Sequence, residues 1–107
     1  MAEVKWTKRA QKAKRALYLN GLEQFGAITA EKTLRKVTTI AADLAKWPTS
    51  GHPEQLLLGE SPLYRAKPIN DRFNGIIYCY DEENDTVVIE DIWDTRRNPE
   101  TLKQRMT

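Results

Sequence analysis

Two groups of cations in the second half of the chain stand where they could bind an anion. Arg65 and Lys67 are two residues apart, so in a strand both side chains would project from one face. Arg96 and Arg97 are adjacent and directly follow a segment rich in branched and aromatic residues. Guanidinium and ammonium groups bind phosphate or carboxylate oxygens through charge-assisted hydrogen bonds. The pattern therefore predicts a site for a phosphate or for a carboxylate of a partner.

The arginine pair also has a purely structural interpretation. Asp91, Asp94 and Glu100 lie close to Arg96 and Arg97 in the sequence, so local salt bridges are an alternative. Exposed ion pairs of this kind contribute little to stability. Both interpretations of the pair are open at this point.

Tyrosines accompany the cations of the second half. Tyr64, Tyr78 and Tyr80 fall in predicted strands. Their rings could stack on bases beside a basic groove that Arg65 and Lys67 would line on the sheet face left uncovered by the helices. Tyrosines of a small sheet more often pack in the core or at an edge. The candidate residues for binding a target or a nucleic acid are Arg65, Lys67, Arg97, Tyr78 and Tyr80.

The spacing of potential ligand residues does not indicate a metal or cofactor site. No ligand pattern surrounds His52 or the single Cys79, which falls in a predicted strand where a small apolar side chain is suitable. The acidic run 81–85 lacks the glycine and the alternating oxygen ligands of a calcium loop, and it predicts a solvated turn. We expect no metal and no small-molecule cofactor.

Length and composition predict a single domain over residues 1–107. The hydrophobic fraction of 40% and the charged fraction of 30% are ordinary for a globular protein. No apolar run approaches the roughly 18 residues that cross a bilayer, and the N-terminal residues lack the apolar core of a signal peptide. Together with the lone cysteine, this predicts a cytoplasmic protein without membrane association.

The net charge of +2 conceals an asymmetry between the two halves of the chain. Residues 1–50 hold ten Lys or Arg and four Asp or Glu, a balance of +6, whereas residues 51–107 hold seven and eleven, a balance of −4. Six cations and no acid lie between Lys5 and Arg15. Such a segment favours nucleic acid or an acidic protein as a partner, and its alternative is an ordinary solvated helix face.

The N-terminal half predicts one strand and two helices. Residues 3–7 alternate like a short strand, and an amphipathic helix should follow and end at Gly26 as its C-terminal cap. Thr29 is the expected N-cap of a second helix, which Trp47 and Pro48 end. Its apolar seam is predicted from residues at spacings of four and three: Ala30, Leu34, Val37, Ala41 and Leu44.

The second half predicts three strands, over 63–69, 73–80 and 86–93. Their short polar connections indicate an antiparallel meander with 73–80 in the middle. The middle strand is apolar on both faces, so we expect helices to cover one face and a further element or a partner to cover the other. Pro68 suits an edge or a bulge.

Two segments flank these strands. The irregular connection 48–62 contains three consecutive leucines at 56–58, which should attach it to the core. Asn98 and Pro99 suit the start of a short C-terminal helix. The predicted fold class is α+β, with an N-terminal strand and an antiparallel helical hairpin packed on a small, mainly antiparallel twisted sheet.

This order of elements resembles the RelE/ParE superfamily of type II toxins, which includes plasmid stabilisation proteins. The resemblance rests on the opening VKWTKRAQKA and on NGIIYCYDEENDTVVIEDIWDTRRNP, which looks like the family's last two strands and closing turn. It implies a small prokaryotic toxin with a cognate antitoxin that wraps it with an extended, acidic segment. RelE-like members cleave mRNA in the ribosomal A site, and ParE-like members poison DNA gyrase.

The RelE-like activity implies a particular set of residues. Cleavage needs a group that takes the ribose 2′-OH proton, cations that hold the developing charge and a group that protonates the leaving oxygen. The family supplies an arginine on the central strand, basic residues on the preceding strand, an arginine after the last strand and often a tyrosine or histidine near the C-terminus.

Carried onto this chain, the set is incomplete. Gly75 stands near the central-strand arginine, and Arg72 lies three residues earlier, out of register. Leu102 stands near the C-terminal tyrosine. Arg65 with Lys67 fits the basic residues of the preceding strand, and Arg96 or Arg97 fits the arginine after the last strand. Arg72 and Arg96 are therefore the candidate catalytic residues.

Three classes of function follow from the resemblance. The incomplete set favours a toxin that binds a macromolecular target, DNA gyrase or the translating ribosome, without chemistry. The alternatives are a ribosome-dependent mRNA endoribonuclease with an altered arginine-based site and a non-toxic interaction module that keeps the fold and the antitoxin-binding surface.

Overall fold

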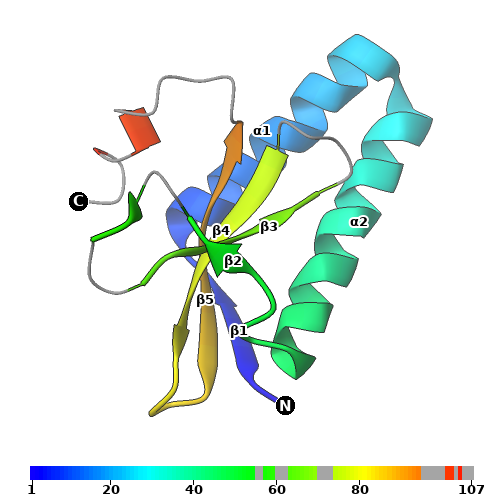
Figure 1. Ribbon diagram of the computed structural model, residues 1–107. Coiled ribbons are helices and arrows are strands. Elements are labelled where there is room, and N and C mark those ends of the chain that lie inside the picture. The colour runs from blue at the N-terminus through cyan, green and yellow to red at the C-terminus, as the bar shows by residue number, and fades with distance from the viewer. Residues whose placement is uncertain (55–56, 60–62, 70–73, 95–100, 103, 105–107) are drawn as a thin grey trace.

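A helical hairpin packs on one face of a five-stranded sheet in the computed structural model (Figure 1). The structure describes residues 1–54, 57–59, 63–69, 74–94, 101–102 and 104. This architecture is the predicted α+β class. No helix of the described residues is long and apolar enough to cross a membrane.

The sheet has the strand order β1-β5-β4-β3-β2. Its long strands are β4 (Asn74–Asp81) and β5 (Thr86–Asp94), with β3 (Arg65–Pro68) antiparallel to β4 on the other side. The predicted meander with its middle strand between the other two is therefore confirmed. Two pairings were not predicted: β1 (Glu3–Trp6) runs parallel to β5, and the two-residue β2 (His52–Pro53) pairs with β3.

The first helix, α1 (Lys8–Phe25), begins at a residue that also holds it to the sheet. Thr7 is its N-cap: the threonine Oγ1 accepts a hydrogen bond of 3.0 Å from the Ala10 amide. The same hydroxyl donates to the Glu90 carbonyl at 3.2 Å, and the Thr7 amide donates to the Ile89 carbonyl at 3.0 Å. Thr7 thus ends β1, starts α1 and fixes both against β5.

Gly26 alone forms the turn between the helices. As predicted, it caps α1, and its amide donates to the Leu22 carbonyl at 3.1 Å. Its φ of 90° lies in the region that favours glycine and reverses the chain so sharply that α2 (Ala27–Lys46) starts at the next residue. The prediction of Thr29 as N-cap was wrong, because Thr29 already lies in the first turn of α2 and its carbonyl accepts from the Thr33 hydroxyl.

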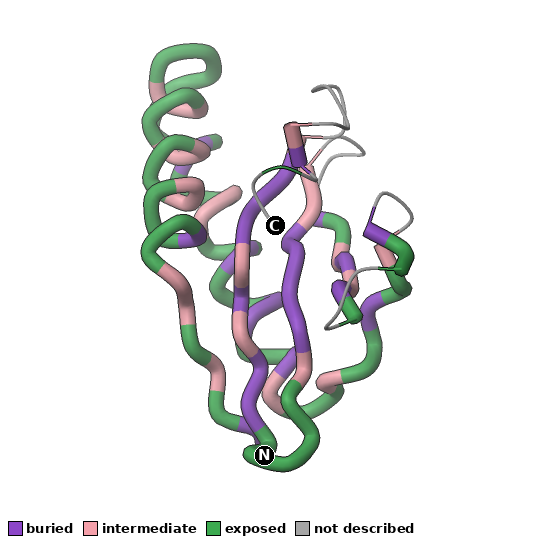
Figure 2. Tube along the Cα trace, turned by 90° about the vertical axis from the view of Figure 1, so that its left-hand side faces the viewer, coloured by how far each residue is buried: buried purple, intermediate pink, exposed green. Residues whose placement is uncertain are grey.

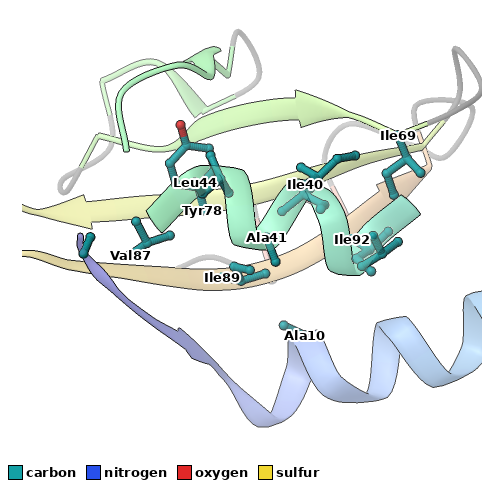
Figure 3. Packing of buried hydrophobic residues seen from close by; sticks show 12 residues of the cluster. Ala10, Ile40, Ala41, Leu44, Ile69, Tyr78, Val87, Ile89 and Ile92 are labelled. Atoms are coloured by element: carbon teal, nitrogen blue, oxygen red, sulfur yellow. The ribbon is translucent and has the colours of Figure 1, made fainter. Parts of the chain in front are cut away.

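The helix-side cluster is the larger of two apolar cores (Figure 3). Ala30, Val37, Ala41 and Leu44 of the predicted α2 seam are buried. Leu34 is only half-buried, whereas Ile40, which the predicted seam did not include, is buried. From the sheet, the cluster receives side chains of β4 and β5: Ile76, Tyr78, Val87, Ile89 and Ile92.

The second cluster lies on the opposite face of the sheet. Ile77 and Cys79 project there from β4, as the predicted alternation required, and Trp93 joins them from β5. Leu57 of the irregular connection and Leu102 of the C-terminal segment complete the cluster with Tyr64 and Ala66. The expected cover from a further element is therefore present, and Figure 2 shows the two central strands buried along most of their length.

The predictions for the leucines at 56–58 and for the C-terminal helix have mixed outcomes. Leu57 is buried but Leu58 is 53% exposed, and Leu56 lies outside the described residues. Thr101, Leu102 and Gln104 have helical backbone, whereas the predicted helix start at Asn98 and Pro99 lies outside the described residues.

A β-bulge sets which side chains of β5 face which core. Tyr78 pairs with Ile89 and Ile77 pairs with Asp91, so Glu90 is an extra residue between two ladder pairs. The insertion reverses the alternation of β5, so that Ile92 joins the helix-side cluster and Asp91 becomes fully buried on the other face. The Asp91 Oδ1 accepts a hydrogen bond of 2.9 Å from the Ile92 amide.

Burial of Cys79 predicts a dependence of stability on alkaline pH. Burial, with a smaller contribution from the Glu90 carboxylate, raises the pKa of the Cys79 thiol from 9.0 to about 12. The folded state therefore keeps a proton that the unfolded chain releases above pH 9.0. We expect the free energy of unfolding, measured with urea, to fall as the pH rises from 9 towards 12.

Cys79→Ala is the matched control, because it removes the thiol and keeps a small apolar side chain at the site. The fall in stability across this pH interval should be smaller in the variant than in the unsubstituted chain. Equal falls would show that other groups cause the pH dependence.

Candidate functional site

The predicted cations of β3 lie on the helix side of the sheet. Arg65 pairs with Tyr78 and Lys67 with Ile76, and residues paired across antiparallel strands project to the same face. Arg65 and Lys67 project to one face, as predicted. The prediction of which face was wrong, because they lie on the face that the helices cover and not on the opposite one. Because the helices pack mainly over β5 and β1, β3 lies at the margin of the area that they cover.

Arg65 is engaged with the backbone that follows α2. Its Nη1 donates to the Gly51 carbonyl at 2.8 Å and to the Thr49 carbonyl at 3.4 Å. The side chain is half-buried, so these bonds orient its guanidinium towards the loop between α2 and β2. Arg65 thereby attaches that loop to the sheet.

Tyr78 is directly beside this contact. Its hydroxyl accepts a hydrogen bond of 2.8 Å from the Gly51 amide, and its side chain is fully buried. Burial raises the pKa of the Tyr78 phenol, opposed by the Gly51 amide, the Arg65 charge and the Ser50 hydroxyl. The ring is not a surface on which a base could stack, so that part of the prediction does not fit the structure. Gly51, Arg65 and Tyr78 are called the Gly51 junction below.

Lys67 and Tyr80 are more accessible than the Gly51 junction. Lys67 is half-buried, and its side chain makes no hydrogen bond or ion pair with the residues that the structure describes. Tyr80 is also half-buried, and its hydroxyl donates to Asp85 Oδ1 at 2.7 Å. That hydrogen bond is the main cause that raises the Tyr80 pKa. The two side chains lie on either side of the Arg65–Tyr78 pair along the sheet.

The positions carried over from RelE-like toxins are only partly described. Arg72, Arg96 and Arg97 lie outside the described residues. Gly75 lies in β4 opposite Trp93, and Leu102 is fully buried in the second cluster. At the position that the resemblance aligns with a catalytic tyrosine, this chain therefore has a core residue.

Sequence reasoning missed an acidic hollow beside the β4–β5 turn. It has a volume of about 410 Å³ and is lined by Cys79, Tyr80, Asp81, Glu82, Glu83, Val88 and Glu90. Burial raises the pKa of Glu90, while the Arg9 charge lowers it. The bulge that adds Glu90 gives no recognisable signal in the sequence. No group of three or more potential metal ligands occurs among the described residues.

A family model covers nearly the whole of this fold. It is described as the ParE toxin of the type II toxin-antitoxin system parDE, and it matches residues 4–99. The chain belongs to the ParE toxin family. The matched residues of this ParE family member include both helices, β2 to β5, and β1 from Val4 onward, so the match extends well beyond the segments that carry the sequence resemblance.

Solved structures share the fold of this ParE family member at low sequence identity. The chromosomal ParDE system from P. aeruginosa aligns with a TM-score of 0.70 and 18% identity, over 88% of this chain and 96% of that chain. The toxin-antitoxin complex RelBE2 from Mycobacterium tuberculosis gives 0.60 and 20%, over 87% and 96%. The isolated E. coli RelE toxin gives 0.59 and 14%, over 97% and 98%. Comparison with curated proteins gives no match.

Close packing at the Gly51 junction predicts that Gly51 does not tolerate a side chain. A Cβ there would lie 2.6 Å from the Tyr78 hydroxyl and 2.8 Å from the Ala66 carbonyl oxygen, which belongs to the sheet backbone. We expect Gly51→Ala to lower the free energy of unfolding by about 1–3 kcal/mol, measured by urea unfolding. Gly75→Ala is the control, because its Cβ would meet the Lys67 carbonyl oxygen at an ordinary 3.6 Å. Equal losses would contradict the packing argument.

Removal of the Tyr78 hydroxyl should lower stability more than removal of the Tyr80 hydroxyl. Tyr78→Phe leaves the buried Gly51 amide without its acceptor, which should cost about 1–3 kcal/mol of stability. Tyr80→Phe removes an exposed hydrogen bond and should change stability by less than about 0.5 kcal/mol. Thermal and urea unfolding of both variants measure the difference. A larger loss in Tyr80→Phe would show that the junction does not hold the loop.

Proposed function

We propose that this chain is a growth-inhibiting toxin that acts by binding a protein target, with DNA gyrase as the first candidate, and that a cognate antitoxin neutralises it. Membership of the ParE toxin family supports the toxin role. The RelBE2 neighbour is described as a toxin-antitoxin complex, which supports an antitoxin as partner.

The observation that carries the choice of mechanism is the structural use of three candidate site positions. RelE-like cleavage needs free side chains at two of them, Arg65 and Leu102, and the third, Tyr78, is the candidate for stacking on a base. The Arg65 guanidinium holds the Gly51 carbonyl, and the buried Tyr78 hydroxyl holds the Gly51 amide. Leu102 fills the second cluster. Cleavage of RNA requires cations and proton-transfer groups that reach the substrate. These three side chains instead stabilise the fold, which favours binding of a target over chemistry.

A growth assay tests this function. We expect tight induction of the chain in bacteria to arrest growth and to leave transcript 5′ ends unchanged. We expect the purified chain to inhibit DNA supercoiling by purified gyrase. Co-expression of the neighbouring gene product as antitoxin should restore growth. An Arg96→Ala/Arg97→Ala variant reports whether the pair contributes to target binding. Lys32→Ala/Lys36→Ala, which removes two exposed cations of α2, is its charge-matched control.

The outcomes separate the three classes of function. Arrest with supercoiling inhibited and transcripts intact supports the proposal, and loss of arrest in the arginine variant alone places the pair in the target site. Arrest with new 5′ ends would overturn it in favour of a ribosome-dependent endoribonuclease. Unimpaired growth with tight binding of the neighbouring gene product would identify a non-toxic interaction module.

A further inference from the structure

The outward side of α1 carries a line of cations. Lys8, Lys12 and Arg15 are exposed and recur at spacings of four and three, so they lie on one side of the helix. Ala10, with Ala13 and Leu17, projects from the opposite side into the helix-side cluster, and Figure 3 shows Ala10 pointing towards the sheet. We call Lys8, Lys12 and Arg15 the α1 stripe. At a rise of about 1.5 Å per residue, it is roughly 10 Å long.

The α1 stripe differs from the other two cations of α1, Arg9 and Lys14, which already have partners. Lys14 places its Nζ 4.6 Å from the centre of the Trp6 ring, and Arg9 interacts within the described structure. By contrast, no ion pair joins a member of the stripe to another described residue. Three positive charges therefore face solvent together.

Helix stability does not account for this arrangement. The N-terminal end of a helix carries a partial positive charge and is stabilised by acidic residues. The first turn of α1 has no acidic residue, its last turn has no basic residue, and no acid occurs between Glu3 and Glu23. Lys8 and Lys12 also repel each other at a spacing of four. Lys8 stands in the first turn, where a cation is unfavourable, and Lys12 adds repulsion, which points to a ligand that benefits from these charges.

The chemistry of the stripe favours a duplex phosphate backbone over a protein surface. Protein interfaces are anchored by buried apolar and aromatic side chains and are depleted in lysine, whereas the stripe consists only of cations. Single strands need exposed rings for stacking, whereas the stripe has no aromatic member, the Trp6 ring lies under Lys14, and Tyr18 of α1 is half-buried. Modules that bind duplex RNA span about 16 base pairs across two successive minor grooves, a far longer footprint than the stripe of roughly 10 Å.

We propose that the α1 stripe binds the phosphate backbone of duplex DNA without reading its sequence. Each lysine or arginine neutralises one phosphate, and the released counterions drive association. This site lies on a different element from the candidate target site on β3 and stands independently of the proposed function.

Fluorescence anisotropy of a labelled DNA duplex of arbitrary sequence, titrated with the purified full-length chain, tests the inference. For three phosphate contacts, log K should fall against log salt with a slope of about −2.7, so affinity should drop about 40-fold for a fourfold rise in salt. In Lys8→Ala/Lys12→Ala/Arg15→Ala, we expect binding at low salt to weaken at least about tenfold and the slope to decrease by about 2.7.

Lys32→Ala/Arg35→Ala/Lys36→Ala is the matched control, because it removes the same charge from the exposed surface of α2. It should retain most of the DNA affinity, and circular dichroism should show both variants folded. If DNA affinity weakened equally in the two variants, the effect would come from net charge alone, and the proposed site on α1 would be wrong. Absence of DNA binding would identify an ordinary solvated face.

Competitors decide the class of ligand. The proposal requires that duplex DNA binds more tightly than a duplex RNA of the same length and than poly-glutamate. Tighter binding of RNA would overturn DNA as the source of the phosphates, and tighter binding of poly-glutamate would assign the stripe to an acidic protein partner.

Discussion

The two-sided apolar character of β4 and β5 is the constraint on which the rest of the structure depends. Ile76 and Ile77 are neighbours on one strand, yet each is fully buried, on opposite faces of the sheet. A strand of this kind is stable only where both faces are shielded from water. The helical hairpin shields one face, and Leu57 and Leu102 shield the other. Leu57 of the irregular connection and Leu102 near the C-terminus are therefore core residues.

The same constraint explains why two candidate site residues, Arg65 and Tyr78, have structural roles. The loop after α2 must return to the sheet so that β2 can pair with β3, and its backbone polar groups need partners there. Arg65 and Tyr78 provide them at Gly51, where a side chain has no room. A guanidinium held by two carbonyls is poorly placed to receive phosphate, which is why the Gly51 junction supports a binding toxin more than a ribonuclease.

Most charged side chains lie on the surface, outside the two apolar clusters. The basic excess of residues 1–50 lies on solvent-facing sides of the helices, and the acidic excess of the second half includes the hollow beside the β4–β5 turn. The charged side chains of these regions belong to neither apolar cluster. These surfaces give the molecule two regions of opposite charge.

The sequence by itself determined the elements, the alternation on the middle strand, the meander and the cap at Gly26, because these follow from local periodicity and turn chemistry. It also contained the cations of α1 and β3. Only the tertiary structure decided the parallel pairing of β1 with β5, the bulge at Glu90, the face on which Arg65 lies and the burial of Tyr78 and Leu102. Each of these depends on contacts between residues far apart in the chain. The start of α2 at Ala27 instead of Thr29 shows the same limit, since a single glycine at positive φ outweighed a favourable capping residue.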